Sequence, residues 1–253
     1  MKCVAFFAVM TALCALTGTF VTAETSGGAV WGYKYIDAAM ASPTQWGEHY
    51  PTCAGSRQSP IDIATTSGGN LAKRSLTFSG ECADFNLTQS DESFKASVVG
   101  GSCSVKANGA SFAMAQFHLH APSEHTLNGK ALDGEAHFVH SNTDGSALLV
   151  VGLFLQVTNG GKTDPWVASV LDGMDNLVDT SIKANRVYNY AGSLTTPACD
   201  EIVDWWVVQT PIKISTKDFQ RLQAQLKELH VADNGKNARP VQTLNGRTIT
   251  SLK

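Results

Sequence analysis

The sequence carries little charge and has no concentration of basic residues. Charged residues make up 16% of its 253 residues, the formal net charge is −3, and lysine and arginine are nowhere clustered. Because nucleic-acid binding depends on a basic patch that meets the phosphates, this composition argues against a nucleic-acid partner. Internal repeats and low-complexity tracts are also missing. The length and the 43% hydrophobic content predict a globular chain with one domain over residues 29–253.

Only one long apolar run occurs, and it lies at the N-terminus. Residues 4–21 are uncharged, follow Lys2, and lead into the small residues of "VTA" at 21–23. Threonines and a glycine dilute the run, so a signal peptide over residues 1–23 is favoured over a membrane anchor. With no later apolar run long enough to span a membrane and no lipid-anchor tail, we expect a secreted or extracytoplasmic chain without a stable membrane anchor.

A Cys-x-x-Cys pair is absent, so a thiolate zinc site is not indicated. Four of the six cysteines follow the predicted signal peptide: Cys53, Cys82, Cys103 and Cys199. In an exported chain they predict two disulfides, and the sequence alone leaves all three pairings open. Asn86, followed by Leu-Thr, is the one glycosylation sequon, and it predicts a glycoprotein if the host glycosylates.

Glycine and proline recur throughout residues 27–211 and separate short runs of alternating or β-branched character. The runs are 95–99, 102–107, 112–120, 135–141, 147–157 and 205–214. This density of short strands predicts a mainly β domain, in which the apolar run 147–157 is a central strand covered on both faces. Two helices are expected, one over 164–177 with Asp164 as its N-cap, and one that follows an S-x-x-D cap formed by Ser215 and Asp218.

The segment "QFHLH" (116–120) places two histidines on an otherwise apolar strand. Successive side chains of a strand point to opposite faces, so His118 and His120 share one face while Phe117 and Leu119 share the other. On an inward face, two imidazoles need hydrogen-bonding partners or a cation. Taken alone, the pair is more often a surface feature or a hydrogen-bonded core pair than a ligand set.

A third histidine, His137, lies on the next predicted strand, beyond the fourteen residues 121–134. A loop of this length returns the second strand antiparallel to the first, so imidazoles from two strands converge on one point. Three neutral imidazoles with one open position are the ligand set of a catalytic zinc ion. Gln116 and Glu135 each lie two residues before a histidine, where they would orient it. The alternative for Glu135 is a solvated strand residue.

Six motifs in family order give the chain a resemblance to the α-class carbonic anhydrases, which extends from "WGY" (31–33) to "NGR" (245–247). The motifs are "QSPIDI" (58–63), "QFHLH" (116–120), "SEHTLNG" (123–129), "EAHFVH" (135–140), "GSLTTP" (192–197) and "NARPVQ" (237–242). The resemblance implies a single domain around a large, twisted, mostly antiparallel sheet with a few short surface helices. Ala121, where animal members carry tryptophan, resembles the microbial, algal and plant branches.

The resemblance also implies roles for individual residues. One Zn²⁺ would be held by His118, His120 and His137, and these would be oriented by Gln116, Glu135 and Asn237. Thr195 would accept a hydrogen bond from zinc-bound hydroxide because Glu124 takes the proton of its own hydroxyl. Thr196 would border the substrate. The apolar pocket would consist of Val139, Val150, Leu194 and Trp205.

The implied reaction is the reversible hydration of CO2 to bicarbonate and a proton by attack of zinc-bound hydroxide. Vigorous members carry a proton-shuttle histidine, whereas this chain has Glu92 at the aligned position and no histidine between His49 and His118. A carboxylate accepts a proton poorly near neutral pH, so proton transfer is expected to limit turnover at low buffer. Secreted relatives join the positions of Cys53 and Cys199, which leaves Cys82 to pair with Cys103.

Two other functions stay open alongside the enzyme. A catalytically silent member, serving as a binding or structural module, should lack a zinc ligand or the Thr195 and Glu124 pair, and this chain keeps them all. A zinc hydrolase would need a carboxylate free to act as general base. His125 and His140 are expected to be structural, hydrogen-bonded histidines. A homodimer is compatible with the sequence.

Overall fold

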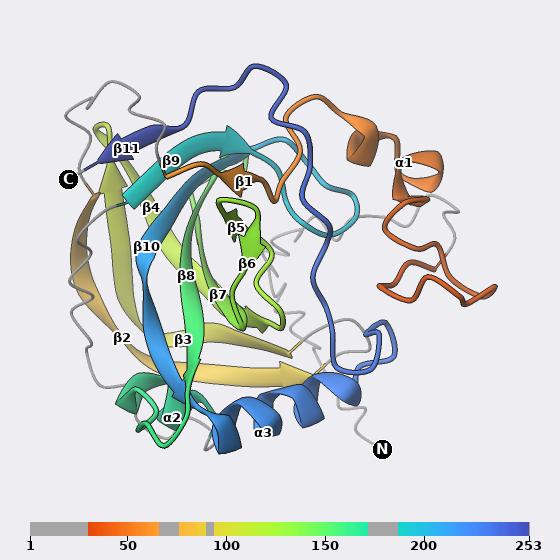
Figure 1. Ribbon diagram of the computed structural model, residues 1–253. Coiled ribbons are helices and arrows are strands. Elements are labelled where there is room, and N and C mark those ends of the chain that lie inside the picture. Colours follow the sequence, from red (N-terminus) through yellow and green to blue (C-terminus); the bar gives the residue numbers. More distant parts are fainter. Residues whose placement is uncertain (1–29, 66–75, 90–93, 172–186, 253) are drawn as a thin grey trace, which may run out of the picture.

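Long strands dominate the computed structural model, which describes residues 30–65, 76–89, 94–171 and 187–252 (Figure 1). In chain order the elements are α1 (Trp46–His49), the 3₁₀ turn η1 (Pro51–Ala54), β1 (Asp62–Ile63), β2 (Leu76–Gln89), β3 (Phe94–Ala107), β4 (Ala110–His120), β5 (Thr126–Leu127), β6 (Lys130–Ala131), β7 (Gly134–Ser141), β8 (Leu148–Thr158), α2 (Pro165–Leu171), β9 (Val187–Gly192), β10 (Val203–Ser215), α3 (Thr216–Lys227) and β11 (Thr250–Leu252).

Eight of the strands form one sheet in the order β11-β9-β10-β8-β7-β4-β3-β2. Only the pair β8 and β10 is parallel, and every other neighbouring pair is antiparallel. Figure 1 shows the sheet strongly curved, with β2 and β3 as long arcs at one edge. The expected single domain with a large, mostly antiparallel sheet and few helices is confirmed. A small sheet of β1, β5 and β6 lies beside it.

The strand predictions were accurate in the centre of the sheet and incomplete at its edge. The runs 112–120, 135–141 and 147–157 correspond to β4, β7 and β8, and β8 is buried on both faces over most of its length, as predicted. The runs 95–99 and 102–107 are instead one strand, β3. Gly101 has a φ of +75°, a conformation that glycine adopts without strain, so the backbone bends here without ending the strand.

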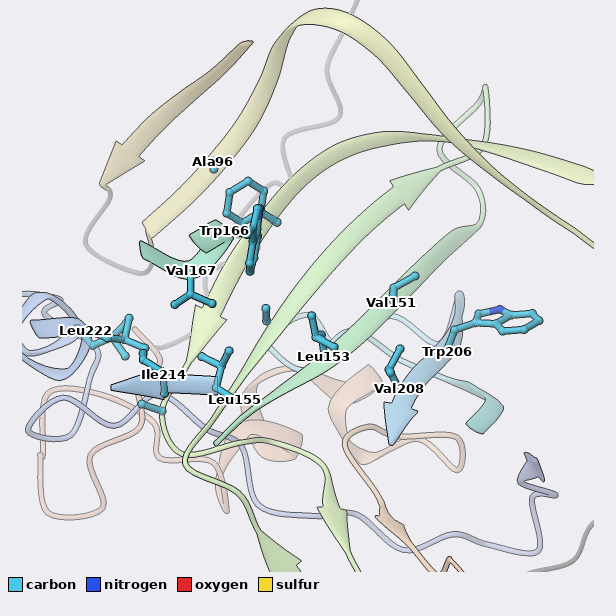
Figure 2. Packing of buried hydrophobic residues seen from close by; sticks show 14 of the residues in the cluster. Ala96, Val151, Leu153, Leu155, Trp166, Val167, Trp206, Val208, Ile214 and Leu222 are labelled. Atoms are coloured by element: carbon cyan, nitrogen blue, oxygen red, sulfur yellow. The ribbon is translucent and has the colours of Figure 1, made fainter. Parts of the chain in front are cut away.

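One face of the large sheet packs against α2 and α3 through apolar side chains (Figure 2). Phe117, Leu153 and Trp206 come from the sheet, while Trp166 and Leu222 come from the two helices. Helix α3 begins as predicted, because the Ser215 side chain accepts a hydrogen bond from the backbone N–H of Asp218. Helix α2 is described to Leu171, and residues 172–177 of the predicted helix lie outside the described residues.

Two disulfides are present among the described residues. Cys53 of η1 is bonded to Cys199, and Cys82 of β2 is bonded to Cys103 of the neighbouring strand β3. These are the pairings that the resemblance implies, and two disulfides fit an exported protein.

Two predictions cannot be followed into the structure, because the proposed signal peptide (1–23) and Glu92 lie outside the described residues. Asn86, the sequon residue, is exposed on β2. None of the helices described in these ranges is long and apolar enough to cross a membrane.

Candidate metal centre

Three histidines meet on the face of the sheet that α2 and α3 leave uncovered. His118 and His120 lie on β4, and His137 lies directly opposite His118 on β7. The imidazole centroids are 5.0 Å apart for His118 and His120, 5.3 Å for His118 and His137, and 4.5 Å for His120 and His137. Phe117 and Ala136, each adjacent in sequence to one of these histidines, point into the core on the other face, so strand alternation brings the three imidazoles together.

Each of the three imidazoles has one nitrogen close to a predicted partner. Nδ1 of His118 donates to Oε1 of Gln116 at 2.8 Å, and Nδ1 of His120 donates to the backbone oxygen of Asn237 at 2.7 Å. Nε2 of His137 lies 3.0 Å from Oε1 of Glu135, although without the alignment of a hydrogen bond. The nitrogens left over are Nε2 of His118, Nε2 of His120 and Nδ1 of His137.

These three nitrogens fit a metal ion. One nitrogen from each histidine lies within 4.8 Å of the other two, and Nε2 of His120 is buried without a hydrogen-bond partner among the described residues. Burial lowers the pKa of His118 well below its usual value, and the neighbouring His120 and His137 lower it further. Burial also lowers the pKa of His120. Neutral imidazoles are the form that coordinates zinc, and three of them leave a fourth position open.

A second group of possible ligands, His125, Glu135 and His137, overlaps the first. Both ring nitrogens of His125 are already engaged, Nδ1 with Glu135 Oε1 at 2.8 Å and Nε2 with the Tyr190 hydroxyl at 2.7 Å. Because His125 has no nitrogen left for a metal, the group of His118, His120 and His137 is the better ligand set.

Glu135 is a buried carboxylate that contacts several groups behind the three histidines. Its Oε2 accepts hydrogen bonds from the backbone N–H groups of Glu124 at 3.0 Å and His125 at 2.9 Å. Burial opposes a charge on Glu135, but the neighbouring His125 and His137 outweigh it and hold the pKa of this carboxyl well below its usual range. In return, although burial alone would lower the pKa of His137, the carboxylate of Glu135 raises it. Gly152 faces this carboxylate, and a Cβ there would come within 2.7 Å of Oε1.

A chain of buried polar groups connects Glu135 to the segment that precedes Thr195. His125 bridges Glu135 and Tyr190, and the Tyr190 hydroxyl lies 2.9 Å from Oγ of Ser59. That Oγ accepts a hydrogen bond from the backbone N–H of Ser193 at 3.0 Å. The orientation of His137 is therefore tied to the start of the loop that carries the two threonines.

Thr195 and Glu124 are both buried but are not directly joined. Oε1 of Glu124 accepts from the backbone N–H of Arg239 at 2.8 Å. Oε2 of Glu124 lies 3.5 Å from Nε2 of His120 and 3.8 Å from Nδ1 of His137, and it has no hydrogen-bond partner in the described part of the chain. The expected hydrogen bond from Thr195 is not present, and this oxygen lies beside His120 and His137 instead.

The predicted apolar pocket forms a row beside the histidines. Gln116, Val139, Val150 and Trp205 are consecutive cross-strand partners on β4, β7, β8 and β10. This row is two residues along each strand from the row of His118 and His137, on the same face. The Trp205 ring packs 4.8 Å from that of His137, and its indole N–H donates to the backbone oxygen of Ser193 at 3.0 Å. Leu194 packs against the same apolar cluster, and Thr196 is partly exposed.

Some residues of the site were given no role in the sequence analysis, although two of them lie within its motifs. Ser59 and Tyr190 complete the buried chain, and the backbone N–H of Arg239 holds Glu124. Buried polar residues inside the apolar segment "VYNYAG" (187–192) were the available signal for Tyr190. The contact from Arg239 is made by its backbone N–H, so the identity of its side chain does not reveal it.

Comparison with known proteins shows similarity to carbonic anhydrases. A family profile described as eukaryotic-type carbonic anhydrase matches residues 41–253. The chain is similar to the carbonic anhydrase of Neisseria gonorrhoeae, with 30% identity over 95% of each chain. It is also similar to the carbonic anhydrase of Nostoc sp., with 32% identity over 87% of this chain and 84% of the relative.

Solved structures share the fold. The α-carbonic anhydrase of Thermovibrio ammonificans, solved with the inhibitor sulfanilamide, has a TM-score of 0.72 and 33% identity, covering 88% of this chain and 100% of that one. Dioscorin complexed with ascorbate has a TM-score of 0.72 and 26% identity, covering 88% and 98%. The profile match over most of the chain and the similar relatives show that the chain belongs to the eukaryotic-type carbonic anhydrase family.

Proposed function

We propose that this protein is a zinc-dependent carbonic anhydrase, which hydrates CO2 reversibly to bicarbonate and a proton. The observation that carries the proposal is the convergence of three imidazole nitrogens within 4.8 Å. His118, His120 and His137 would hold one Zn²⁺ per chain. Zinc, when bound, acts as a Lewis acid that lowers the pKa of a coordinated water, a property for which carbonic anhydrases are the standard illustration.

The residues behind the histidines would fix their orientation and tautomer. Gln116 and the backbone oxygen of Asn237 accept the Nδ1 protons of two imidazoles, which leaves each Nε2 without a proton and available to the metal. Glu135, charged and buried, would do the same for His137 through Nε2.

Thr195 and Glu124 would orient the nucleophile. A hydroxyl has one proton, so if Glu124 accepts the proton of Thr195, the threonine oxygen can only accept a hydrogen bond from the attacking group. Oε2 of Glu124 is buried, lacks a partner among the described residues, and faces the histidines, so it is available for this role. Thr196, beside it on the loop, would border the substrate.

The apolar row beside the histidines would receive CO2. Val139, Val150 and Trp205 are almost fully buried, and Leu194 completes the wall. A small nonpolar molecule needs no hydrogen-bonding partner, so it can bind against these apolar side chains. A polar molecule there would lose its hydrogen bonds to water without gaining others.

The test is stopped-flow CO2 hydration on the zinc-loaded protein, before and after chelation, with zinc content measured on the same samples. We expect turnover with one zinc per chain, loss on chelation, and recovery on zinc addition. One bound zinc per chain without turnover would instead identify a catalytically silent binding module. Ester hydrolysis that exceeds CO2 hydration would identify a zinc hydrolase.

Turnover should depend on buffer concentration. With Glu92 at the position of the proton-shuttle histidine, proton export would rely on buffer, so imidazole should raise the CO2 hydration rate at low buffer. Equal rates in dilute and concentrated buffer would contradict this.

Export and processing are tested separately: we expect the mature N-terminus of the secreted protein at Glu24, and a mass increase at Asn86 in a glycosylating host.

A further inference from the structure

A lysine lies on the histidine side of the sheet, next to the metal centre. In the pairing of β3 with β4, Ala96 lies opposite Phe117 and Ser97 lies opposite Gln116. Continued by one residue, this register places Lys95 directly across from His118. Cross-strand neighbours of this kind have Cβ atoms about 5 Å apart, well within the length of a lysine side chain.

The face of Lys95 is fixed by its neighbours on β3. Ala96 is buried in the core with Phe117, on the side covered by the helices. Lys95 and Ser97 therefore point the other way, because side chains alternate along a strand. Lys95 is exposed while His118 is partly buried, so the lysine lies where the site meets solvent.

Among the described residues, no carboxylate forms an ion pair with the ammonium group of Lys95. The two acidic groups of the site, Glu124 and Glu135, are buried and engaged by histidines. An ammonium group is a compact point charge at neutral pH, which attracts anions without imposing a fixed geometry. Lys95 is also among the groups that lower the pKa of His118, after burial, His120 and His137.

We propose that Lys95 is a specificity-determining residue that attracts small monovalent anions, bicarbonate among them, to the metal centre. The inference rests on the proposed function, because it assumes a metal held by the three histidines. It concerns charged ligands only: uncharged CO2 gains nothing from the ammonium group, whereas bicarbonate and inorganic anions do.

The experiment compares anion affinities of Co²⁺-substituted protein, with thiocyanate and bicarbonate as probes and the visible cobalt spectrum as the readout. Lys95→Gln removes the charge and keeps much of the length, while Lys95→Arg keeps the charge. Lys106→Gln is the matched control: Lys106 also lies on β3 with buried neighbours on both sides, but about 35 Å along the strand.

We expect Lys95→Gln to weaken both anions about 3- to 10-fold at low ionic strength, the range that Coulomb's law gives for unit charges roughly 3–6 Å apart at the dielectric constant of water, which applies because Lys95 is exposed. The difference should shrink as salt is added, because exposed charges are screened. Lys95→Arg and Lys106→Gln should stay close to wild type. Unchanged affinities in Lys95→Gln, or equal losses in Lys106→Gln, would overturn the inference while CO2 hydration still supports the function. Failure of Co²⁺ to bind the histidines would overturn both.

Discussion

The two faces of the large sheet are built from the same strands but from different chemistry. On β7, Ala136 and Phe138 point toward α2 and α3, and the alternate residues Glu135, His137 and Val139 point toward the metal centre. The helix-covered face is held by apolar packing, which is non-directional and tolerates substitutions of similar volume. The histidine face combines an apolar cluster that includes Val139 with hydrogen bonds and charges, and these polar interactions depend on individual atoms.

The histidine face is also where polar atoms remain without partners. Five buried side-chain nitrogen or oxygen atoms of the described residues lack a hydrogen bond, and three of them belong to His120, Glu124 and His137. Nε2 of His137 lies beside the carboxylate of Glu135, so the two unsatisfied atoms that remain at the site are Nε2 of His120 and Oε2 of Glu124. Buried polar atoms in native structures nearly always have partners, so these two atoms mark a point where a ligand could bind. The helix-covered face is thus closed by apolar packing, whereas the histidine face carries side chains that could hold a metal ion.

The largest effect is expected on the histidine face. His118→Ala should remove zinc and reduce CO2 hydration to the level of the chelated protein, a loss of several orders of magnitude. The protein should still fold, because His118 contributes little to the apolar core. Zinc content, CO2 hydration and thermal unfolding are measured together. A variant that keeps one zinc per chain and full turnover would show that the metal lies elsewhere.

The converse is expected on the helix-covered face. Leu153→Ala deletes a side chain that is 1% exposed within the core, so it should lower the free energy of unfolding by about 2–5 kcal/mol. Specific activity and zinc stoichiometry, measured on folded protein well below its melting temperature, should stay at wild-type values. Urea unfolding gives the stability change. A comparable loss of activity in folded protein would mean that the two faces are coupled.

The histidine face was more predictable from the sequence than the sheet's edge. Alternation assigns His118, His120 and His137 to one side because each lies between apolar residues that mark the other side. Strand β2 was missed because most of its side chains are exposed, and because the apolar and polar residues that alternate in "LTFS" (76–79) and in "FNLT" (85–88) are put out of phase by a register shift between them. An edge strand exposed over most of its length lacks the burial that produces a periodic signal.

Contacts that depend on the backbone were not predictable. The carbonyl of Asn237 and the N–H of Arg239 are backbone atoms, and every residue type supplies the carbonyl and every type except proline supplies the N–H. The resemblance implied a role for Asn237, but it assigned none to Arg239, although Arg239 lies within the motif "NARPVQ" (237–242). The missing hydrogen bond between Thr195 and Glu124 was likewise not foreseen, because it depends on the rotamer of one buried carboxylate.

An intermediate effect is expected from the groups that orient His137. Glu135→Gln removes the charge that faces His125 and His137, and it should weaken zinc binding about 10- to 100-fold, as is typical for partners of metal-bound histidines. Tyr190→Phe, one step further along the buried chain, should weaken it less. Competition with a chelator gives the zinc affinity. If Tyr190→Phe has the larger effect, the chain acts through the Thr195 loop and not through His137.

The smallest effect at neutral pH comes from a histidine on the helix-covered face. His140 is buried, donates to the backbone oxygen of Phe138 at 3.0 Å, and burial lowers its pKa to about 4. In the unfolded chain the pKa is about 6.5, so between pH 6.5 and pH 4 the unfolded state binds a proton that the folded state does not. Stability is unaffected above pH 6.5 and falls by about 1.4 kcal/mol per pH unit as the pH drops toward 4.

His140→Gln tests this, because glutamine stays neutral and can still donate to the backbone. Relative to the variant, the wild type should lose about 3 kcal/mol of unfolding free energy between pH 7 and pH 4, with the difference vanishing above pH 6.5. Urea unfolding across this pH range provides the measurement, and the difference between the two proteins cancels the titration of all other groups. Parallel curves would mean that His140 is protonated in the folded state. The helix-covered face would then accommodate a buried charge, as the histidine face does, and the two faces would differ only in how many charged groups they bury.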